Sequence, residues 1–385
     1  HEVFHFTNDP KGATNALAEI NRLAGIRGWA YRNAPDLIVL GRTALKLDAD
    51  PKLVLDKLYH PAREHDPNFA GTAQAIGDLA LSKSDYELAG RTFQLALKRH
   101  PKNADLHFGA ARAFAPSDGK TMTQHLQATL TANPNHAGAR LLMADRLIDR
   151  EAYDEAETQL SKVLAVNPHH PEAWAYRSVI AHLRADTTAE SKAREQALAH
   201  WKTNPRVDHL IGKKLSQKYR FAEGSAHQKQ ALAFDEKYLP AKIQLAQDLL
   251  RLGFEKEGWA MTEAAHESDG YDVTTYNLVT LRDTLGKYTT LTNANFIVRM
   301  DPHEAAIYGP RALRLLDRAH DTLCKKYGLE LEQRTTVEIF AEQKDFGVRT
   351  FGMPDNPGFL GVCFGCVITA NSPASQMPAP ANWES

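Results

Sequence analysis

Apolar residues recur at helical spacing along the first three quarters of the chain, and the pattern restarts at a nearly constant interval. A proline marks each restart, within the stretches HDPNFAG, RHPKNAD, ANPNHAG, VNPHHPEA and TNPRVDH. These prolines are Pro67, Pro101, Pro134, Pro168 and Pro205, and they are 34, 33, 34 and 37 residues apart. Glu236 takes the place of the proline in a sixth copy, AFDEKYLPA. Because one helix pair cannot bury its apolar face alone, this interval predicts stacked helix pairs that share a core.

Large and small side chains recur at fixed distances before each marker. The large residues are Tyr86, Tyr153, Phe221, Phe93, Leu126 and Leu160, and the small ones are Ala89 and Ala156. Small residues let paired helices approach, large ones fill the facing gaps, and proline cannot continue a helix. Trp174 and Gly77 stand where the first helix of a tetratricopeptide repeat (TPR) carries its Trp and Gly. The chain therefore resembles the TPR family over roughly Asp66 to Ser268.

The predicted fold class is mostly α, a TPR α-solenoid followed by a small α/β module. Residues 1–65 are predicted to form degenerate TPR-like helical pairs, because they are helical in pattern but lack the markers. The solenoid is predicted to span residues 66–290, with Tyr271 to Tyr288 supplying a last capping helix. Residues 291–385 form the α/β module.

Such a solenoid usually binds an extended peptide or a partner helix, so we expect a protein or peptide ligand in its concave groove. The TPR clamp for acidic peptide tails needs Lys and Asn at fixed points of the first helix of each repeat. Those points hold Gln74, Asp78, Phe108, Arg112, Leu141 and Asp145. The clamp is absent, and chaperone-tail binding is not expected.

The period changes after residue 295. Residues 296–300 alternate as a strand, and Asp301 followed by Pro302 then opens a helix, with Glu304 placed to reach back to the cap. Gly328 is the expected stop of that helix. Thr335 to Glu342 predicts a second strand, QKDFGVRTFG a short helix or turn, and GFLGVCFGCVITANSP a β-rich end.

These last segments resemble the start of the peptidase MA-like (gluzincin) domain that is attached to TPR arrays in some bacterial proteins. The resemblance is carried by FIVRMDPHEAAIYG, TVEIFAEQKDFGVRTFG, GFLGVCFGCVITANSPAS and PANWES. It implies a zinc-dependent peptidase in which an edge strand pairs with substrate and precedes a helix bearing His-Glu-x-x-His, whose Glu activates water. The metal ligands would follow Ser385, so zinc is expected in a longer parent, and no catalytic residue or metal ligand is expected here. The bacterial cell envelope or periplasm is the compartment that the resemblance suggests.

By the same resemblance, two segments are candidate site residues. The expected substrate-pairing edge comprises Gly361, Val362, Cys363, Phe364, Gly365, Cys366, Val367, Ile368 and Thr369. The expected start of the zinc helix is Asn382, Trp383 and Glu384, with Asn382 as its N-cap. The plainer interpretation of Cys363 and Cys366 is that they are small apolar strand residues, since a zinc ribbon needs a second cysteine pair.

One further motif matches His-Glu-x-x-His by letter only. The stretch HEVFH, His1 to His5, would need a helix, but Val3, Phe4 and Phe6 favour a strand and TNDP breaks any helix that follows. We therefore expect no zinc there. Glu338 and Glu342 project from the second predicted strand, and as a carboxylate pair they have no acid, base or metal partner that the sequence reveals.

Charge and composition exclude two classes of partner. Lys+Arg is 46 and Asp+Glu is 47 in 385 residues, which predicts no bulk attraction to nucleic acid or anionic lipid. No apolar run approaches the ~20 residues of a membrane helix, so no membrane insertion is expected. Three cysteines do not make a disulfide framework. The alternative to a peptidase parent is a non-enzymatic protein–protein interaction scaffold with a docking module at its end.

Overall fold

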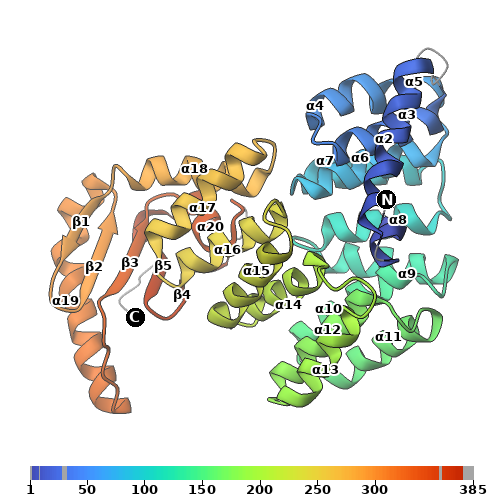
Figure 1. The fold of residues 1–385 in the computed structure, drawn as a ribbon. Coiled ribbons are helices and arrows are strands. Elements are labelled where there is room, and N and C mark those ends of the chain that lie inside the picture. The colour runs from blue at the N-terminus through green and yellow to red at the C-terminus, as the bar shows by residue number, and fades with distance from the viewer. Residues whose placement is uncertain (1, 8, 28–32, 355–357, 376–385) are drawn as a thin grey trace. The chain divides into compact units, whose positions relative to one another are not determined.

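The structure is a computed structural model that describes residues 2–7, 9–27, 33–354 and 358–375. The chain divides into two compact units, His1–Lys214 and Leu215–Ser385. Figure 1 shows helix after helix along the first part of the chain and a sheet near its end. The boundary predicted at residue 291 falls inside the second unit, which joins the last helix pairs to the sheet.

The described residues before the first proline marker form a series of helices joined by short turns, as predicted for 11–65. Their elements are α1 (Glu2–Phe6), α2 (Pro10–Arg27), α3 (Ala34–Lys46), α4 (Pro51–Val54), the π-helical turn η1 (Leu55–Tyr59) and α5 (His60–His65).

The strand predicted for the HEVFH stretch is wrong, because residues 2–6 form α1. The amide of Thr7 donates to the Val3 carbonyl at 3.0 Å, which closes a helical turn locally. Phe6 packs edge-on against Trp201, with ring centroids 5.6 Å apart. A local hydrogen bond and one distant ring contact thus override the strand propensity of Val and Phe.

The marked part of the chain forms antiparallel helix pairs, and the predicted solenoid is confirmed. In the first unit the pairs are α6 (Ala70–Ser82) with α7 (Tyr86–Leu97), α8 (Ala104–Phe114) with α9 (Gly119–Ala132), α10 (Ala137–Asp149) with α11 (Tyr153–Val166), and α12 (Pro171–Leu183) with α13 (Thr187–Ala197). Helix α14 (Pro205–Gln217) crosses the division at residue 214. The second unit continues with α15 (Phe221–Phe234), α16 (Leu239–Arg251), α17 (Glu255–Ser268) and α18 (Val273–Leu285), the last of which is the predicted capping helix.

Packing within the pairs follows the predicted alternation of large and small residues. Phe93 of α7 is fully buried, and Ala89 one turn earlier is buried too. A Cβ added to Gly77 would lie 2.2 Å from the Phe93 ring, and one added to Gly109 would lie 2.3 Å from it. Glycine on α6 and on α8 therefore makes room for one aromatic ring that fixes three helices together.

The second unit ends in a five-stranded mixed sheet in the order β1-β2-β3-β5-β4. Its strands are β1 (Thr289–Thr292), β2 (Phe296–Met300), β3 (Thr335–Phe340), β4 (Gly361–Cys363) and β5 (Val367–Asn371). β2, β3 and β5 run parallel to one another, while β1 and β4 are antiparallel to their neighbours. β1 was not predicted, since four residues of alternating burial give too short a signal.

Helices cover both faces of this sheet. Helix α19 (Pro302–Tyr327) packs on the face formed by Val298, Met300 and Val337. Helix α20 (Gln343–Phe351) packs on the other face, in a core that also takes Leu278 of α18 and Phe221 of α15. The last helix pairs and the sheet thus share one hydrophobic core, which explains why they form a single unit.

The ends of α19 agree with the sequence prediction except at one contact. Asp301 accepts hydrogen bonds from the amides of His303 and Glu304, and Gly328 ends the helix at a positive φ of 63°. Glu304 was predicted to reach back to the cap. Its carboxylate instead accepts a hydrogen bond of 2.7 Å from Ser372 at the end of β5, so a tertiary contact replaces the local one.

Candidate functional site

The first helices of successive pairs lie side by side, since α6 contacts α8, α8 contacts α10 and α10 contacts α12. Their side chains therefore share one surface, on which polar residues recur. We refer to Gln74, Asp78, Arg112, Asp145 and Tyr176 as the polar row.

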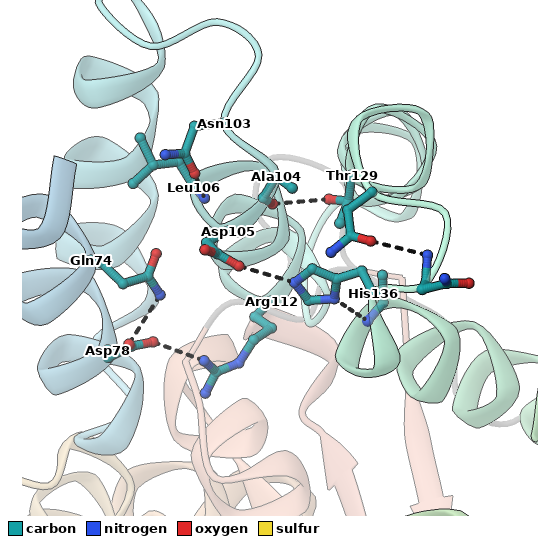
Figure 2. Close-up of polar contacts among 12 residues, drawn as sticks. Gln74, Asp78, Asn103, Ala104, Asp105, Leu106, Arg112, Thr129 and His136 are labelled. Atoms are coloured by element: carbon teal, nitrogen blue, oxygen red, sulfur yellow. Dashed lines mark hydrogen bonds and ion pairs between the residues drawn. The ribbon is translucent and has the colours of Figure 1, made fainter. Parts of the chain in front are cut away.

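The start of the polar row is a connected chain of hydrogen bonds, shown in Figure 2. Gln74 donates to the Asp78 carboxylate at 3.0 Å, and Arg112 of the next pair donates to the same carboxylate at 2.9 Å. The guanidinium of Arg112 also lies 5.7 Å from the ring centre of Phe108. The side chains of Asp78 and Arg112 are 39% and 40% exposed. Ion pairs this exposed add only about 0–1 kcal/mol to stability, so their groups can be exchanged for those of a partner at little cost.

Further along, the polar row is more deeply buried. The hydroxyl of Tyr176 donates to Asp145 at 3.1 Å. Lys214, only 2% exposed, lies 2.8 Å from Asp145 and 2.6 Å from Asp149. Burial raises the pKa of Tyr176 well above its usual value, and the charge of Asp145 adds to the shift. Tyr176 therefore stays a hydrogen-bond donor, and this end of the row is structurally fixed.

The six residues at the positions of the TPR clamp lie in different surroundings. Gln74, Asp78 and Arg112 are brought together, and Asp145 joins a separate group. The Phe108 ring contacts that of His136 at a tilt of 53°, with ring centroids 4.7 Å apart, and Leu141 is half-buried. Tyr176 and Lys214 were not predicted as site residues. A repeat-length step of 34 residues from Asp145 leads to Val179, three residues past Tyr176, and Lys214 lies beyond the insert before Pro205, so neither residue keeps the repeat spacing.

A histidine pair lies in the same repeat as Arg112, between α8 and α9. The Nδ1 atoms of His107 and His125 are 2.9 Å apart, and His107 Nε2 is 3.0 Å from the Pro101 carbonyl. A carbonyl only accepts, so His107 Nε2 carries the proton and its Nδ1 is the acceptor for His125 Nδ1–H. Burial lowers the pKa of His125, and the neighbouring His107 lowers it further.

Acid is expected to destabilise the first unit through this pair. A histidine whose pKa is lower in the folded than in the unfolded protein costs no stability while the pH is above its unfolded-state pKa. As the pH falls below that value toward the folded-state pKa, the unfolded state takes up the proton first, and the free energy of unfolding decreases. His125→Phe should therefore reduce the fall in melting temperature between pH 7.5 and pH 5 by about 2 °C, the shift of a small single-site effect. Melting curves of His65→Phe, an exposed histidine, serve as the control. Equal pH profiles for His125→Phe and the unchanged chain would contradict the assignment.

The predicted substrate-pairing edge is two strands rather than one. Gly361–Cys363 forms β4 and Val367–Asn371 forms β5, joined by a tight turn in which Gly365 has a φ of +96°. β5 lies between β3 and β4, so the main chain of Val367, Ile368 and Thr369 is already paired. The prediction that these three residues are at an edge is wrong, because the turn at Gly365 folds them into the sheet.

β4 is the part of this segment that lies at the end of the strand order. The amide of Phe364 donates to the Val367 carbonyl, and the Leu360 carbonyl accepts from the amide of Asn371. The main-chain groups of Val362, which lies midway between Leu360 and Phe364, therefore also face β5. By the alternation of an antiparallel ladder, the main-chain groups of Gly361 and Cys363 point away from β5. Val362 and Phe364 are buried, whereas the Cys363 side chain is exposed and that of Cys366 is half-buried.

The remaining predicted site residues, Asn382, Trp383 and Glu384, lie outside the described residues. Within the described ranges, no group of three or more His, Cys, Asp or Glu side chains is placed to hold a metal ion. No helix in that part of the chain is long and apolar enough to cross a membrane.

Glu338 has partners that the sequence did not reveal. It is 1% exposed, and its carboxylate lies 2.7 Å from Arg349 Nε and 3.4 Å from Arg299 Nη1. Arg299 also binds both carboxylate oxygens of Glu255 on α17, at 2.6 and 2.8 Å. Arg349 donates to the Leu250 carbonyl at 3.2 Å. This ionic cluster links β2, β3 and α20 to the last helix pair.

Comparison with known proteins identifies the helix pairs. Two models described as tetratricopeptide repeat match residues 75–120 and 123–180. The chain carries tetratricopeptide repeats. The matched TPR stretches include Asp78, Arg112, Asp145 and Tyr176, so these four residues of the polar row lie within TPR repeats. No curated protein matches the chain significantly.

Solved structures are similar to the chain at low identity. A thermophilic TPR protein of Thermus thermophilus is 19% identical, with 47% of this chain and 99% of that protein covered and a TM-score of 0.39. A tetratricopeptide repeat protein of Parabacteroides merdae is 14% identical, with 64% and 97% covered and a TM-score of 0.42. Yeast Tom70 is 15% identical, with 72% and 60% covered and a TM-score of 0.42.

Proposed function

We propose that the chain is a protein-interaction scaffold that binds a polypeptide along the polar row of its TPR array. The observation that carries the proposal is the half-exposed chain Gln74–Asp78–Arg112, which spans two successive repeats. Its hydrogen bonds are weak enough in water to be exchanged for those of a partner. A polypeptide main chain supplies the donors and acceptors that such a surface can bind.

Site-specific photo-crosslinking in cells of the source organism tests this proposal. A crosslinker at residue 74 should capture a partner that one at residue 91, an exposed position on α7, does not. With the purified partner, Arg112→Gln should weaken binding about tenfold, the effect of one charged hydrogen bond. Arg91→Gln is the matched control, with a change below about twofold. Capture at both residues, or equal affinities for the two variants, would argue against the polar row.

We also propose that the second unit includes the front part of a zinc peptidase-like domain. The proposal rests on the resemblance of residues 291–385, and the antiparallel strand β4 at the end of the sheet supports it. In that family such an edge pairs with the substrate main chain. Here the outward-pointing groups of Gly361 and Cys363 would do so.

The native gene product decides between a peptidase and a scaffold alone. Its intact mass, its zinc content and its cleavage of casein with and without chelator are the measurements. Zinc together with chelator-sensitive cleavage would support the peptidase proposal. A product that holds no zinc and leaves casein intact would refute it, and the TPR scaffold would remain.

A further inference from the structure

A cavity of about 340 Å³ lies in the first unit, lined by the end of α5, the start of α6 and the last part of α7. Its volume is at the lower end of the roughly 300–1,000 Å³ that small-molecule sites occupy. Apolar side chains form much of its lining, among them Phe69, Ile76 and Leu95. A Cβ on Gly71 would lie 2.6 Å from the Phe69 ring, so the glycine allows that ring to lie against α6.

Positive charge surrounds this apolar lining. Arg63, Lys98, Arg99 and His100 line the cavity, against the single acidic residue Asp66. Arg99 donates to the Pro67 carbonyl at 2.7 Å, which holds the loop that closes one side. Within the described ranges, the side chains of Arg63 and Lys98 make no ion pair. The side chains of Arg63 and Lys98 are therefore available to bind an anionic ligand.

A buried hydroxyl and a helix start add two more groups for an anion. Thr72 lines the cavity and is 2% exposed, and its Oγ1 has no hydrogen-bond partner in the described part of the chain. Most buried polar atoms have a hydrogen-bond partner, so an unpaired hydroxyl beside a cavity indicates that a bound ligand supplies the partner. Helix α6 starts at Ala70 after Phe69, whose side chain cannot cap it. Its first amides carry the partial positive charge that attracts carboxylates.

We propose that this cavity binds a small organic acid that carries one carboxylate on an apolar body. The carboxylate would meet Arg63, Lys98 and the start of α6, and the body would cover Phe69, Ile76 and Leu95. An uncharged ligand would leave the cations unused, and inorganic phosphate would leave the apolar lining uncovered. The site is separate from the polar row, since Thr72 and Ile76 lie about 200° around α6 from Gln74 and Asp78. It does not depend on the proposed scaffold function.

Isothermal titration of the full chain with 3-phenylpropanoate tests the proposal. We expect saturable binding with a Kd of about 1 mM or tighter, the range open to a ligand of this size. The uncharged 3-phenylpropanamide and inorganic phosphate should each bind at least about tenfold more weakly. N-acetyl-Gly-Gly-Phe presents the same ring and carboxylate on a peptide and should bind no tighter, because the cavity has room for the end group only.

Variants assign the binding to this cavity. Arg63→Gln with Lys98→Gln should weaken 3-phenylpropanoate at least about tenfold, and Thr72→Val about threefold. The control pair Lys120→Gln with Lys162→Gln removes two exposed charges elsewhere and should leave the Kd within about twofold. Arg63 and Lys98 are exposed, so melting temperatures should not change.

Four results would show that the cavity does not recognise an organic acid. These are no saturable binding, an amide that binds as tightly as the acid, a phosphate that binds equally (an adventitious ion only), and equal losses in the site and control pairs. A peptide that binds tenfold tighter than the acid would overturn the small-molecule assignment and point to a polypeptide ligand instead.

Discussion

Glu338→Leu is expected to destabilise the second unit by about 3–5 kcal/mol, the cost of leaving one member of a buried ion pair without its partner. Arg349 would then be the stranded charge, since its side chain is 1% exposed and Glu338 is its ion-pair partner. Arg299 would suffer less, because it keeps both oxygens of Glu255. The loss should appear as faster hydrogen exchange in β3 and α20.

The double variant Glu338→Leu with Arg349→Met separates charge from packing. Replacing both members of a buried pair by apolar residues is often nearly neutral, so most of the loss should be recovered. Glu342→Leu, an exposed residue just after β3, is the matched control and should change stability by less than about 0.5 kcal/mol. A double variant as unstable as Glu338→Leu alone would show that shape, rather than an unpaired charge, dominates at this position.

Phe93→Ala is expected to cost the TPR array about 3–5 kcal/mol, the range for removing a fully buried aromatic ring. The loss should be large because the ring contacts α6 at Gly77 and α8 at Gly109, so one truncation loosens three helices. Gly77→Ala should cost about 1–3 kcal/mol by overpacking, since its Cβ would meet the ring at 2.2 Å.

Coupling between these sites is the sharper measurement. In the double variant Gly77→Ala with Phe93→Leu, the smaller side chain leaves space for the methyl group. The double variant should therefore be more stable than the sum of the two single changes implies. Leu95→Ala, on the same helix but 62% exposed, should change stability by less than about 0.5 kcal/mol. Urea midpoints of the five variants test this, and strict additivity would place the ring away from Gly77.

Predictions that rest on local chemistry agree with the structure. The proline spacing gives the helix pairs, because a helix and its stop are set within a few residues. The cap at Asp301 and the stop at Gly328 are likewise local. The contact of Glu304 with Ser372 differs from prediction because a partner far along the chain decides it. α1 differs because a local helical hydrogen bond and the distant ring of Trp201 together outweigh strand propensity.

The candidate sites show the same division. Sequence spacing alone aligned Asp78 with Arg112 on successive first helices, since a repeat places equivalent residues on one surface. It could not pair Glu338 with Arg349 and Arg299, because those contacts depend on sheet order and on helix α20 crossing β3. Nor could it separate β4 from β5, since the edge of a sheet is defined by which strand lacks a neighbour. Repetition along the chain determined the array, and only long-range packing decided which strand ends the sheet and which charges are buried together.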